Sequence, residues 1–338
     1  MELGWGIIGT GYHVRANMLS SLAEAKSARV KAICGSSQEK AEELAAEHPG
    51  VKAYARVEDL AADPDVQVVY IATPNHLHVP HGVLSIQAKK HLLLEKPMAL
   101  SVDGAHKLVE AAKKNQVKLG IGFHLRHHPV LQAAREMIAA GEVGDIVFCS
   151  AQFAMDFPWR DNWWSNPLFA GPASLMGMGV HGLDTLSWLK GQEVVEVAAM
   201  ARGGTDNRSL NTLFSLLMTF RDGTQAAVVC GSEIPHSRND VLVYGSKLRL
   251  HAEGAMTMLP PQGRLFLTDR QGTREAEIAL QNPYAREIEA FSAHVLEGAE
   301  FHADGLDGHK SVEITCAAIE AARSRRTVKV GEVLRLTG

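Results

Sequence analysis

A short apolar run that ends in two closely spaced glycines is the feature that most restricts how this chain can fold. The run Trp5-Gly6-Ile7-Ile8 leads into Gly9-Thr10-Gly11, and a stretch of mixed polarity from His13 to about Ala25 follows. This order predicts a strand, a tight turn and a helix. Without side chains at Gly9 and Gly11, the backbone can approach a pyrophosphate, and the helix N-terminus then faces negative charge. Such glycine turns also occur without a ligand, and Val14 occupies the position where a third small residue is usual.

Strands and helices alternate over the first 122 residues, which is typical of a parallel sheet covered on both faces. After a helix expected at 129–140, strands follow one another across turns, and amphipathic stretches at 284–296 and 309–323 indicate closing helices. We therefore predict a doubly wound α/β Rossmann domain over residues 1–122. Residues 123–338 are predicted to form an α+β domain with a large, mostly antiparallel open sheet. The strands expected there are 146–155, 194–202, 212–220, 225–230 and 241–250.

The end of the second predicted strand bears on the choice of dinucleotide. A Rossmann domain that prefers NAD commonly carries an acidic residue there, which binds the ribose hydroxyls. Here the strand runs into Gly35-Ser36-Ser37-Gln38-Glu39-Lys40, without a carboxylate at its tip. Ser36, Ser37 and Lys40 could hold a 2′-phosphate, which favours NADP. Alternatively, one serine caps the next helix and Lys40 is a solvated surface charge.

Composition excludes several other classes of protein. A formal net charge of −4 and a sequence pI near 6.5 give no basic face for nucleic acid. No apolar run approaches the roughly 18 residues of a membrane span, and residues 1–5 lack a basic region followed by an apolar stretch, so we expect no targeting segment. The four cysteines are far apart in sequence, which suits reduced thiols in the cytoplasm. Histidine clusters at 76–81 and 124–128 lack the carboxylates or thiolates of a convincing metal site, so we predict no metal.

Two further motifs follow buried strands. Thr73-Pro74-Asn75-His76-Leu77-His78 comes after one strand and Glu95-Lys96-Pro97 after the next, and parallel sheets bind ligands at such carboxyl ends. Together with the glycine turn and the later segment Gly179-Val180-His181-x-x-Asp184, they resemble the family of glucose-fructose oxidoreductase, inositol dehydrogenase and MocA (Gfo/Idh/MocA). The resemblance covers nearly the whole chain.

The resemblance implies an NAD(P)-dependent dehydrogenase or reductase of class EC 1.1.1.-, with Lys96 as its main catalytic residue. An ammonium near the reacting oxygen can hydrogen-bond it and exchange a proton while the nicotinamide exchanges a hydride. His181 is the matching candidate for acid/base or substrate-binding work, and the Lys96–Pro97 bond is expected in cis. The residues implied or suggested for cofactor binding are Gly9, Thr10, Gly11, Tyr12, His13, Ser36, Ser37, Lys40, Thr73, Pro74, Asn75, His76, Glu95, Lys96, Arg126, Trp159 and Arg160.

The expected substrate is a sugar, polyol or related hydroxy/keto compound, enclosed where the two domains meet. Candidate substrate-binding residues are Lys96, Trp159, Trp163, His181 and Asp184. The aromatic segment 157–164 can stack on a ring, or serve as a hydrophobic plug or subunit contact. Asp184 is equally suited to a hydrogen-bonding role within the core. Many active relatives carry Asp four residues before the His181 position, whereas this chain has Gly177, which favours a reductase that depends on Lys96.

Two alternatives remain open from the sequence. One is a glycosidase that uses tightly held NAD as a transient redox centre, and the other is a dinucleotide-binding regulator without catalysis. The open sheet is expected to be covered by another copy of the chain, as in relatives, giving a homodimer or homotetramer.

Overall fold

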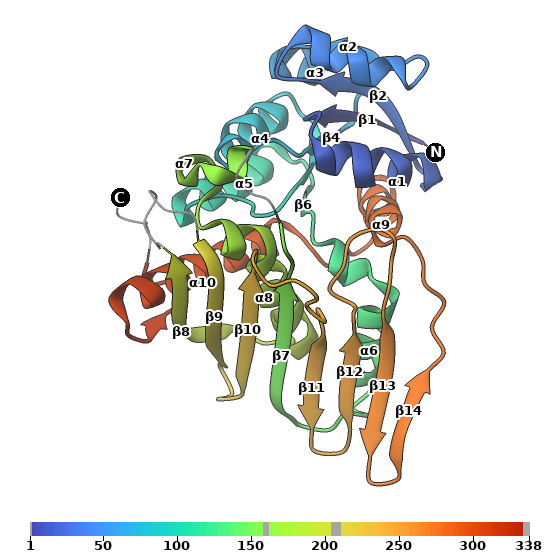
Figure 1. Ribbon diagram of the computed structural model, residues 1–338. Helices are drawn as coiled ribbons and strands as arrows, with labels where there is room; N and C mark the ends of the chain where they lie inside the picture. The colour runs from blue at the N-terminus through green and yellow to red at the C-terminus, as the bar shows by residue number, and fades with distance from the viewer. Residues whose placement is uncertain (1, 158–161, 204–210, 334–338) are drawn as a thin grey trace. The chain divides into compact units, whose positions relative to one another are not determined.

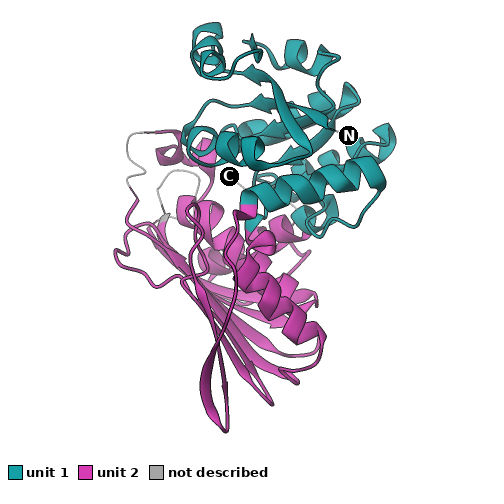
Figure 2. Cartoon of the chain, turned by 90° about the vertical axis from the view of Figure 1, so that its right-hand side faces the viewer, with its two compact units in different colours: residues 1–124, 284–309 teal, residues 125–283, 310–338 magenta. Residues whose placement is uncertain are grey.

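The structure is a computed structural model that describes residues 2–157, 162–203 and 211–333. It divides into two compact units (Figure 2). Unit 1 comprises residues 1–124 and 284–309, and unit 2 comprises residues 125–283 and 310–338. The predicted boundary after residue 122 lies close to the end of the first segment of unit 1. The segment 284–309, however, which the prediction included in the second domain, belongs to unit 1.

Unit 1 contains a six-stranded parallel sheet with the order β3-β2-β1-β4-β5-β6 (Figure 1). Its strands are β1 (Leu3–Ile8), β2 (Ala28–Cys34), β3 (Lys52–Tyr54), β4 (Val68–Ile71), β5 (His91–Leu94) and β6 (Leu119–Ile121). This is the strand order of dinucleotide-binding folds, in which the order reverses between β1 and β4. The predicted Rossmann fold is therefore confirmed. The short strand β3 escaped prediction because its three residues show no apolar run.

Helices cover both faces of this sheet. They are η1 (Val14–Met18), α1 (Leu19–Glu24), α2 (Gln38–Ala46), α3 (Val57–Ala62), η2 (Asn75–Leu77), α4 (His78–Gln87), α5 (Val102–Asn115) and α9 (Pro283–Glu297), and η3 (His124–His127) follows at the boundary with unit 2. Neighbouring residues of β1 show the two faces, because side chains alternate along a strand. A Cβ on Gly6 would lie 2.8 Å from Leu60 of α3, whereas the ring of Trp5 packs edge-on against Phe291 of α9 at 6.1 Å. The amphipathic pattern of α9 predicted a buried side, but not that this side packs on the first sheet.

Unit 2 contains a nine-stranded sheet with the order β14-β13-β12-β11-β7-β10-β9-β8-β15. Its strands are β7 (Ile146–Ala154), β8 (Val194–Gly203), β9 (Asn211–Phe220), β10 (Gln225–Gly231), β11 (Val241–Gly245), β12 (Arg249–Glu253), β13 (Arg264–Asp269), β14 (Gly272–Ala276) and β15 (Val328–Lys329). All neighbouring pairs are antiparallel except β7 and β10, which confirms the predicted sheet. The single strand expected at 241–250 was wrong: a turn after Gly245, closed by its N–H donating to the Leu248 carbonyl at 3.0 Å, divides it into β11 and β12.

Among the described residues, the helices that pack on the unit 2 sheet lie on one of its faces and leave the other open. The helices of unit 2 are α6 (Pro129–Ala139), η5 (Trp163–Ser165), α7 (Pro167–Ala170), η6 (Leu175–Gly179), α8 (Val180–Lys190) and most of α10 (Gly305–Ser324), inside which the chain passes from unit 1 to unit 2. Helix α8 packs on β7 and β10, and α6 packs on β12 and β13, all from one side (Figure 1). Within the residues described, no helix is both long and apolar enough to cross a membrane.

Candidate functional site

The two glycines after β1 have different roles in the protein. Gly9 has a φ of +128°, and a Cβ there would lie 2.6 Å from the carbonyl oxygen of Ala72, so the turn itself requires glycine. A Cβ on Gly11 would meet no protein atom within 4 Å, so internal packing does not require glycine at this position. An open approach to the backbone at Gly11 is what pyrophosphate binding needs. Val14, at the third fingerprint position, is fully buried and contributes to the core instead.

The residues after β2 lie together on the surface. Ser37 is the N-cap of α2, and its hydroxyl accepts a hydrogen bond from the Lys40 N–H at 3.3 Å. The Lys40 ammonium lies 3.4 Å from the Ser36 hydroxyl and donates to it. The capping alternative therefore applies to Ser37, while the ammonium of Lys40 and the hydroxyl of Ser36 remain exposed and close enough to bind one phosphate group together.

The motif after β4 contributes a buried hydroxyl and a buried histidine. The Thr73 hydroxyl is buried and has no hydrogen-bond partner within the described part of the chain, although buried polar groups normally have one. The imidazole of His78, the last residue of the motif, lies 2.9 Å from the Thr73 carbonyl oxygen and 2.8 Å from that of Pro97. His78 therefore ties this loop to the one that carries Lys96, a role that the sequence analysis did not assign to it.

The carboxylate of Glu95, directly after β5, is the centre of a buried polar cluster. Its Oε1 accepts a hydrogen bond from the Tyr70 hydroxyl at 2.6 Å and lies 3.2 Å from Nε2 of His13. A Cβ on Gly122 would lie 2.7 Å from the same oxygen, so glycine there leaves room for the carboxylate. Burial by itself raises the pKa of Glu95, but the charge and hydrogen bond of His13, the charge of Lys96 and the Tyr70 hydrogen bond outweigh burial and lower the pKa to about 2. Glu95 is therefore ionised at neutral pH.

Lys96 follows Glu95 and is half-buried. Burial lowers its pKa below the ordinary value, and the negative charge of Glu95 acts in the opposite direction. A lowered pKa brings the ammonium closer to the range in which it can give up and recover a proton. The Lys96–Pro97 peptide bond is cis, as expected.

Helix α9 adds residues that no motif revealed. Tyr284 is buried, its ring stacks on His124 at 4.3 Å, and it meets the His13 ring edge-on at 5.5 Å. Burial, the Glu95 carboxylate and the fully buried Glu287 carboxylate raise the pKa of Tyr284 well above its usual range. Tyr284 and Glu287 lie 189 and 192 positions after Glu95 in the sequence, so only the fold brings them to the cluster.

Unit 2 contains the remaining candidate residues. Arg126 and Asp184 form a bidentate, buried ion pair, with Nε–Oδ2 and Nη2–Oδ1 distances of 2.9 and 2.6 Å. Asp184 thus has a hydrogen-bond partner within the core, which is one of the two roles expected for it from the sequence. Contacts of Asp184 or Arg126 with substrate or cofactor remain predictions. His181, one helical turn earlier on α8, is 3% exposed and packs against the ring of Phe153 at 5.5 Å.

The aromatic segment is described only in part. Trp159 and Arg160 lie outside the described residues. Trp163 stacks on Trp164, with ring centroids 4.3 Å apart, and both side chains are partly exposed. Such a pair offers a flat apolar surface, which fits both the ring-binding and the contact role expected from the sequence.

The carboxyl edge of the unit 1 sheet fits a dinucleotide. The glycine turn, the Thr73 hydroxyl and the Ser36–Lys40 pair follow β1, β4 and β2, the three central strands at the point where the strand order reverses. Glu95 and Lys96 follow β5, the next strand in the sheet.

Comparisons with known proteins agree with this arrangement. Residues 3–123 match the oxidoreductase family GFO_IDH_MocA, NAD-binding Rossmann fold, and residues 131–251 match the GFO/IDH/MocA C-terminal domain. The chain is similar to a 1,5-anhydro-D-fructose reductase from Ensifer adhaerens, at 26% identity over 96% of this chain and 98% of the relative. It is also similar to a trans-1,2-dihydrobenzene-1,2-diol dehydrogenase from Mus musculus, at 30% identity over 73% of each chain.

A solved structure has nearly the same fold. The aldose-aldose oxidoreductase from Caulobacter crescentus, complexed with glycerol, superposes with a TM-score of 0.90 at 27% identity, covering 97% of this chain and 100% of that one. Both halves of the chain match the family, and its relatives are named as dehydrogenases and reductases. The chain therefore belongs to the GFO/IDH/MocA family of oxidoreductases and is an enzyme of the dehydrogenase and reductase class.

Proposed function

We propose that the protein transfers a hydride between NAD(P) and a sugar, polyol or related hydroxy/keto compound, with Lys96 acting at the reacting oxygen. The observation that carries this proposal is the half-buried ammonium of Lys96 beside the ionised carboxylate of Glu95, at the carboxyl edge of the Rossmann sheet. The relatives named as a 1,5-anhydro-D-fructose reductase and a trans-1,2-dihydrobenzene-1,2-diol dehydrogenase support this substrate class.

Different residues of unit 1 are proposed to bind the dinucleotide and to transfer the proton. The backbone at Gly11 and the hydroxyl of Thr73 would hold the dinucleotide, which supplies a hydride acceptor or donor when it is bound. In the direction of carbonyl reduction, the Lys96 ammonium donates a hydrogen bond to the carbonyl oxygen and stabilises the negative charge that develops there. It then gives its proton to that oxygen, and in the oxidative direction the amine of Lys96 takes the proton back. His181 on unit 2 is proposed as a second substrate-binding or acid/base group.

NADP is the proposed cofactor of the two. The exposed ammonium of Lys40 lies beside the Ser36 hydroxyl after β2. Together these two groups suit the 2′-phosphate of NADP. Calorimetry with NADPH and NADH tests this preference. Tighter binding of NADPH that is lost in Lys40→Ala supports the assignment, whereas tighter binding of NADH contradicts it.

Turnover is tested with a panel of sugars, polyols and keto-sugars that includes 1,5-anhydro-D-fructose and trans-1,2-dihydrobenzene-1,2-diol. Lys96→Ala is expected to lower kcat by about a hundredfold or more while dinucleotide affinity persists. Lys107→Ala, which removes an exposed lysine of α5, is the matched control and should leave kcat unchanged. Failure to bind either dinucleotide would overturn the proposal. Glycoside cleavage without net cofactor turnover would point to the glycosidase, and binding without turnover, indifferent to Lys96→Ala, to the regulator.

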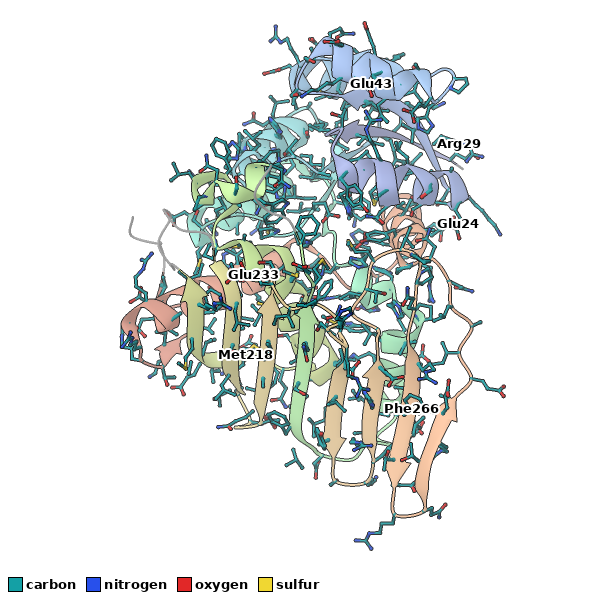
Figure 3. All side chains as sticks on the ribbon, viewed as in Figure 1. Glu24, Arg29, Glu43, Met218, Glu233 and Phe266 are labelled. Atoms are coloured by element: carbon teal, nitrogen blue, oxygen red, sulfur yellow. The ribbon has the colours of Figure 1, made fainter. Side chains whose placement is uncertain are left out.

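A second copy of the chain is the proposed partner of the open sheet face in unit 2. Cross-strand register places Met200, Leu217, Phe148 and Tyr244 on this face, and three of them are exposed by 79%, 54% and 38%, with Phe148 half-buried. The labelled Phe266 of β13 follows on the same face, because it pairs with His251, which in turn pairs with Leu242 on β11 (Figure 3). Apolar side chains spread over a sheet face are typical of an interface between subunits.

Light scattering tests the assembly. A homodimer or homotetramer is expected, and Leu217→Arg should dissociate it, whereas Leu306→Arg, at an equally exposed leucine of unit 1, should not. A monomeric wild type would contradict the proposal. We also propose a cytoplasmic location, which the buried, reduced thiols of Cys34, Cys149 and Cys230 support.

A further inference from the structure

His13 lies between the glycine turn and the carboxylate next to Lys96. It lies two residues after Gly11, and its side chain is 29% exposed. Nε2 of the ring lies 3.0 Å from the Tyr70 hydroxyl oxygen and 3.2 Å from Oε1 of Glu95. Three neighbouring strands, β1, β4 and β5, thus each bring one of these side chains to the same point.

The hydrogen-bond partners of His13 determine where its hydrogen lies. Nδ1 accepts a hydrogen bond from the amide nitrogen of Asn17, one helical turn later, at 3.1 Å. With Nδ1 as an acceptor, the ring carries its hydrogen on Nε2. The Nε2–H points at Tyr70 and Glu95, so His13 is a donor to this pair.

The groups that surround the His13 ring are Tyr70, Tyr284 and Glu95, and Glu95 is the charged one among them. From α9, Tyr284 meets the ring edge-on at 5.5 Å. Burial and Glu95 raise the pKa of Tyr70 well above its usual range, with a smaller contribution from Glu287 of α9. Tyr70 donates its only hydroxyl hydrogen to Oε1 of Glu95. The carboxylate thus accepts the Tyr70 hydroxyl hydrogen and has Nε2 of His13 3.2 Å from the same oxygen, within reach of the ring N–H.

The position of this carboxylate matters because Lys96 is half-buried. Burial disfavours the ammonium form of Lys96, and the charge of Glu95 compensates for this. A carboxylate that loses one donor can turn away, and its effect on the ammonium decreases with distance.

We propose that His13 is a positioning residue that holds the Glu95 carboxylate beside Lys96 and acts on the ammonium through it. The inference rests on the proposed function only for the part that Lys96 plays in hydride transfer. From its sequence, His13 is expected to bind the cofactor, and the new role concerns its contact with Glu95.

The test measures the titration of Lys96 in the full chain without dinucleotide or substrate. Acetic anhydride acetylates only the amine form, so the rate of acetylation at Lys96, followed by peptide mass spectrometry across pH, has a midpoint at the pKa of this lysine. In His13→Phe, which keeps the ring against Tyr284 but removes the donor, the midpoint should fall by about one pH unit, a tenfold change in the ratio of ammonium to amine. His13→Gln, which restores an N–H donor, should return it to the wild-type value.

Control variants separate this role from packing. His302→Phe removes the exposed histidine 3.3 Å from Glu300 in the same unit and should leave the midpoint unchanged. Tyr70→Phe removes the other donor to Glu95 and should lower the midpoint even if His13→Phe does not fold. If His13→Gln behaves like His13→Phe, or if no donor variant moves the midpoint, the inference is wrong. A shifted midpoint in a protein whose turnover is indifferent to Lys96→Ala would instead sustain the inference and overturn the proposed function.

Discussion

Replacing Glu95 by glutamine removes one negative charge from the centre of the unit 1 cluster and nearly preserves its shape. The amide can still accept the Tyr70 hydrogen bond. It can no longer interact as a charge with His13 and Lys96, whose side chains help to lower the pKa of the Glu95 carboxyl to about 2. We expect Glu95→Gln to destabilise unit 1 at neutral pH.

The size and the pH dependence follow from the shift. A pKa that is lowered from its ordinary 4.5 to about 2 in the folded protein corresponds to about 3 kcal/mol of stability. Because the folded pKa is depressed, this contribution is fully present above pH 4.5 and is lost as the pH falls towards 2. The difference between wild type and Glu95→Gln should therefore be about 3 kcal/mol at pH 7 and only about 1 kcal/mol at pH 3.

Hydrogen exchange of the β4 and β5 amides in increasing urea measures this difference for unit 1 alone, which matters because two units need not unfold together. Glu300→Gln is the matched control, since Glu300 is 81% exposed and pairs with His302 at the surface, where ion pairs contribute little. Equal stability of wild type and Glu95→Gln at pH 7, or a difference that grows towards acid pH, would refute the reasoning.

Three further substitutions separate binding from folding. Gly11→Ala should leave the melting temperature unchanged, because its Cβ meets no protein atom, but weaken NADPH binding about tenfold or more by calorimetry; unchanged affinity would argue against a pyrophosphate at this turn. Asp184→Asn should lower the free energy of unfolding in urea by about 3 kcal/mol, because Arg126 is left buried without its counter-ion. Arg126→Leu combined with Asp184→Leu should recover much of this loss. If the double variant does not recover it, the loss is due to packing. His78→Phe removes the one N–H that the neutral ring can donate to the Thr73 or the Pro97 carbonyl, and it should cost about 2 kcal/mol. A loss no larger than that of an exposed histidine would contradict the bridging role.

Local sequence patterns predicted the parts of the fold that depend on near neighbours. The run Trp5–Ile8 with its glycine turn, and the alternation that follows, determined the Rossmann sheet, because strand and helix periodicities are written in consecutive residues. Where such signals are short, the prediction failed. β3 has only three residues, and the turn after Gly245 lies inside an apolar stretch that resembles one strand.

For the candidate site, the sequence predicted which loops carry the residues but not which residues they contact. The motifs identified two loops, one that begins at Thr73 and one that contains Lys96, because each motif is contiguous and follows its own strand. The partners of these residues were not predicted. No pattern connects Arg126 with Asp184, or indicates that His78 contacts two backbone carbonyls.

By itself the sequence determined the class of protein, the two kinds of sheet and the lysine at the carboxyl edge of the first. Only the tertiary structure decided that α9 returns to unit 1, where Tyr284 and Glu287 join the cluster of His13 and Glu95. The amphipathic pattern of a helix predicts that one side is buried, but it does not indicate which of the two sheets buries that side. The choice among them is made by the packing of the whole chain, and with it the electrostatic environment of Lys96.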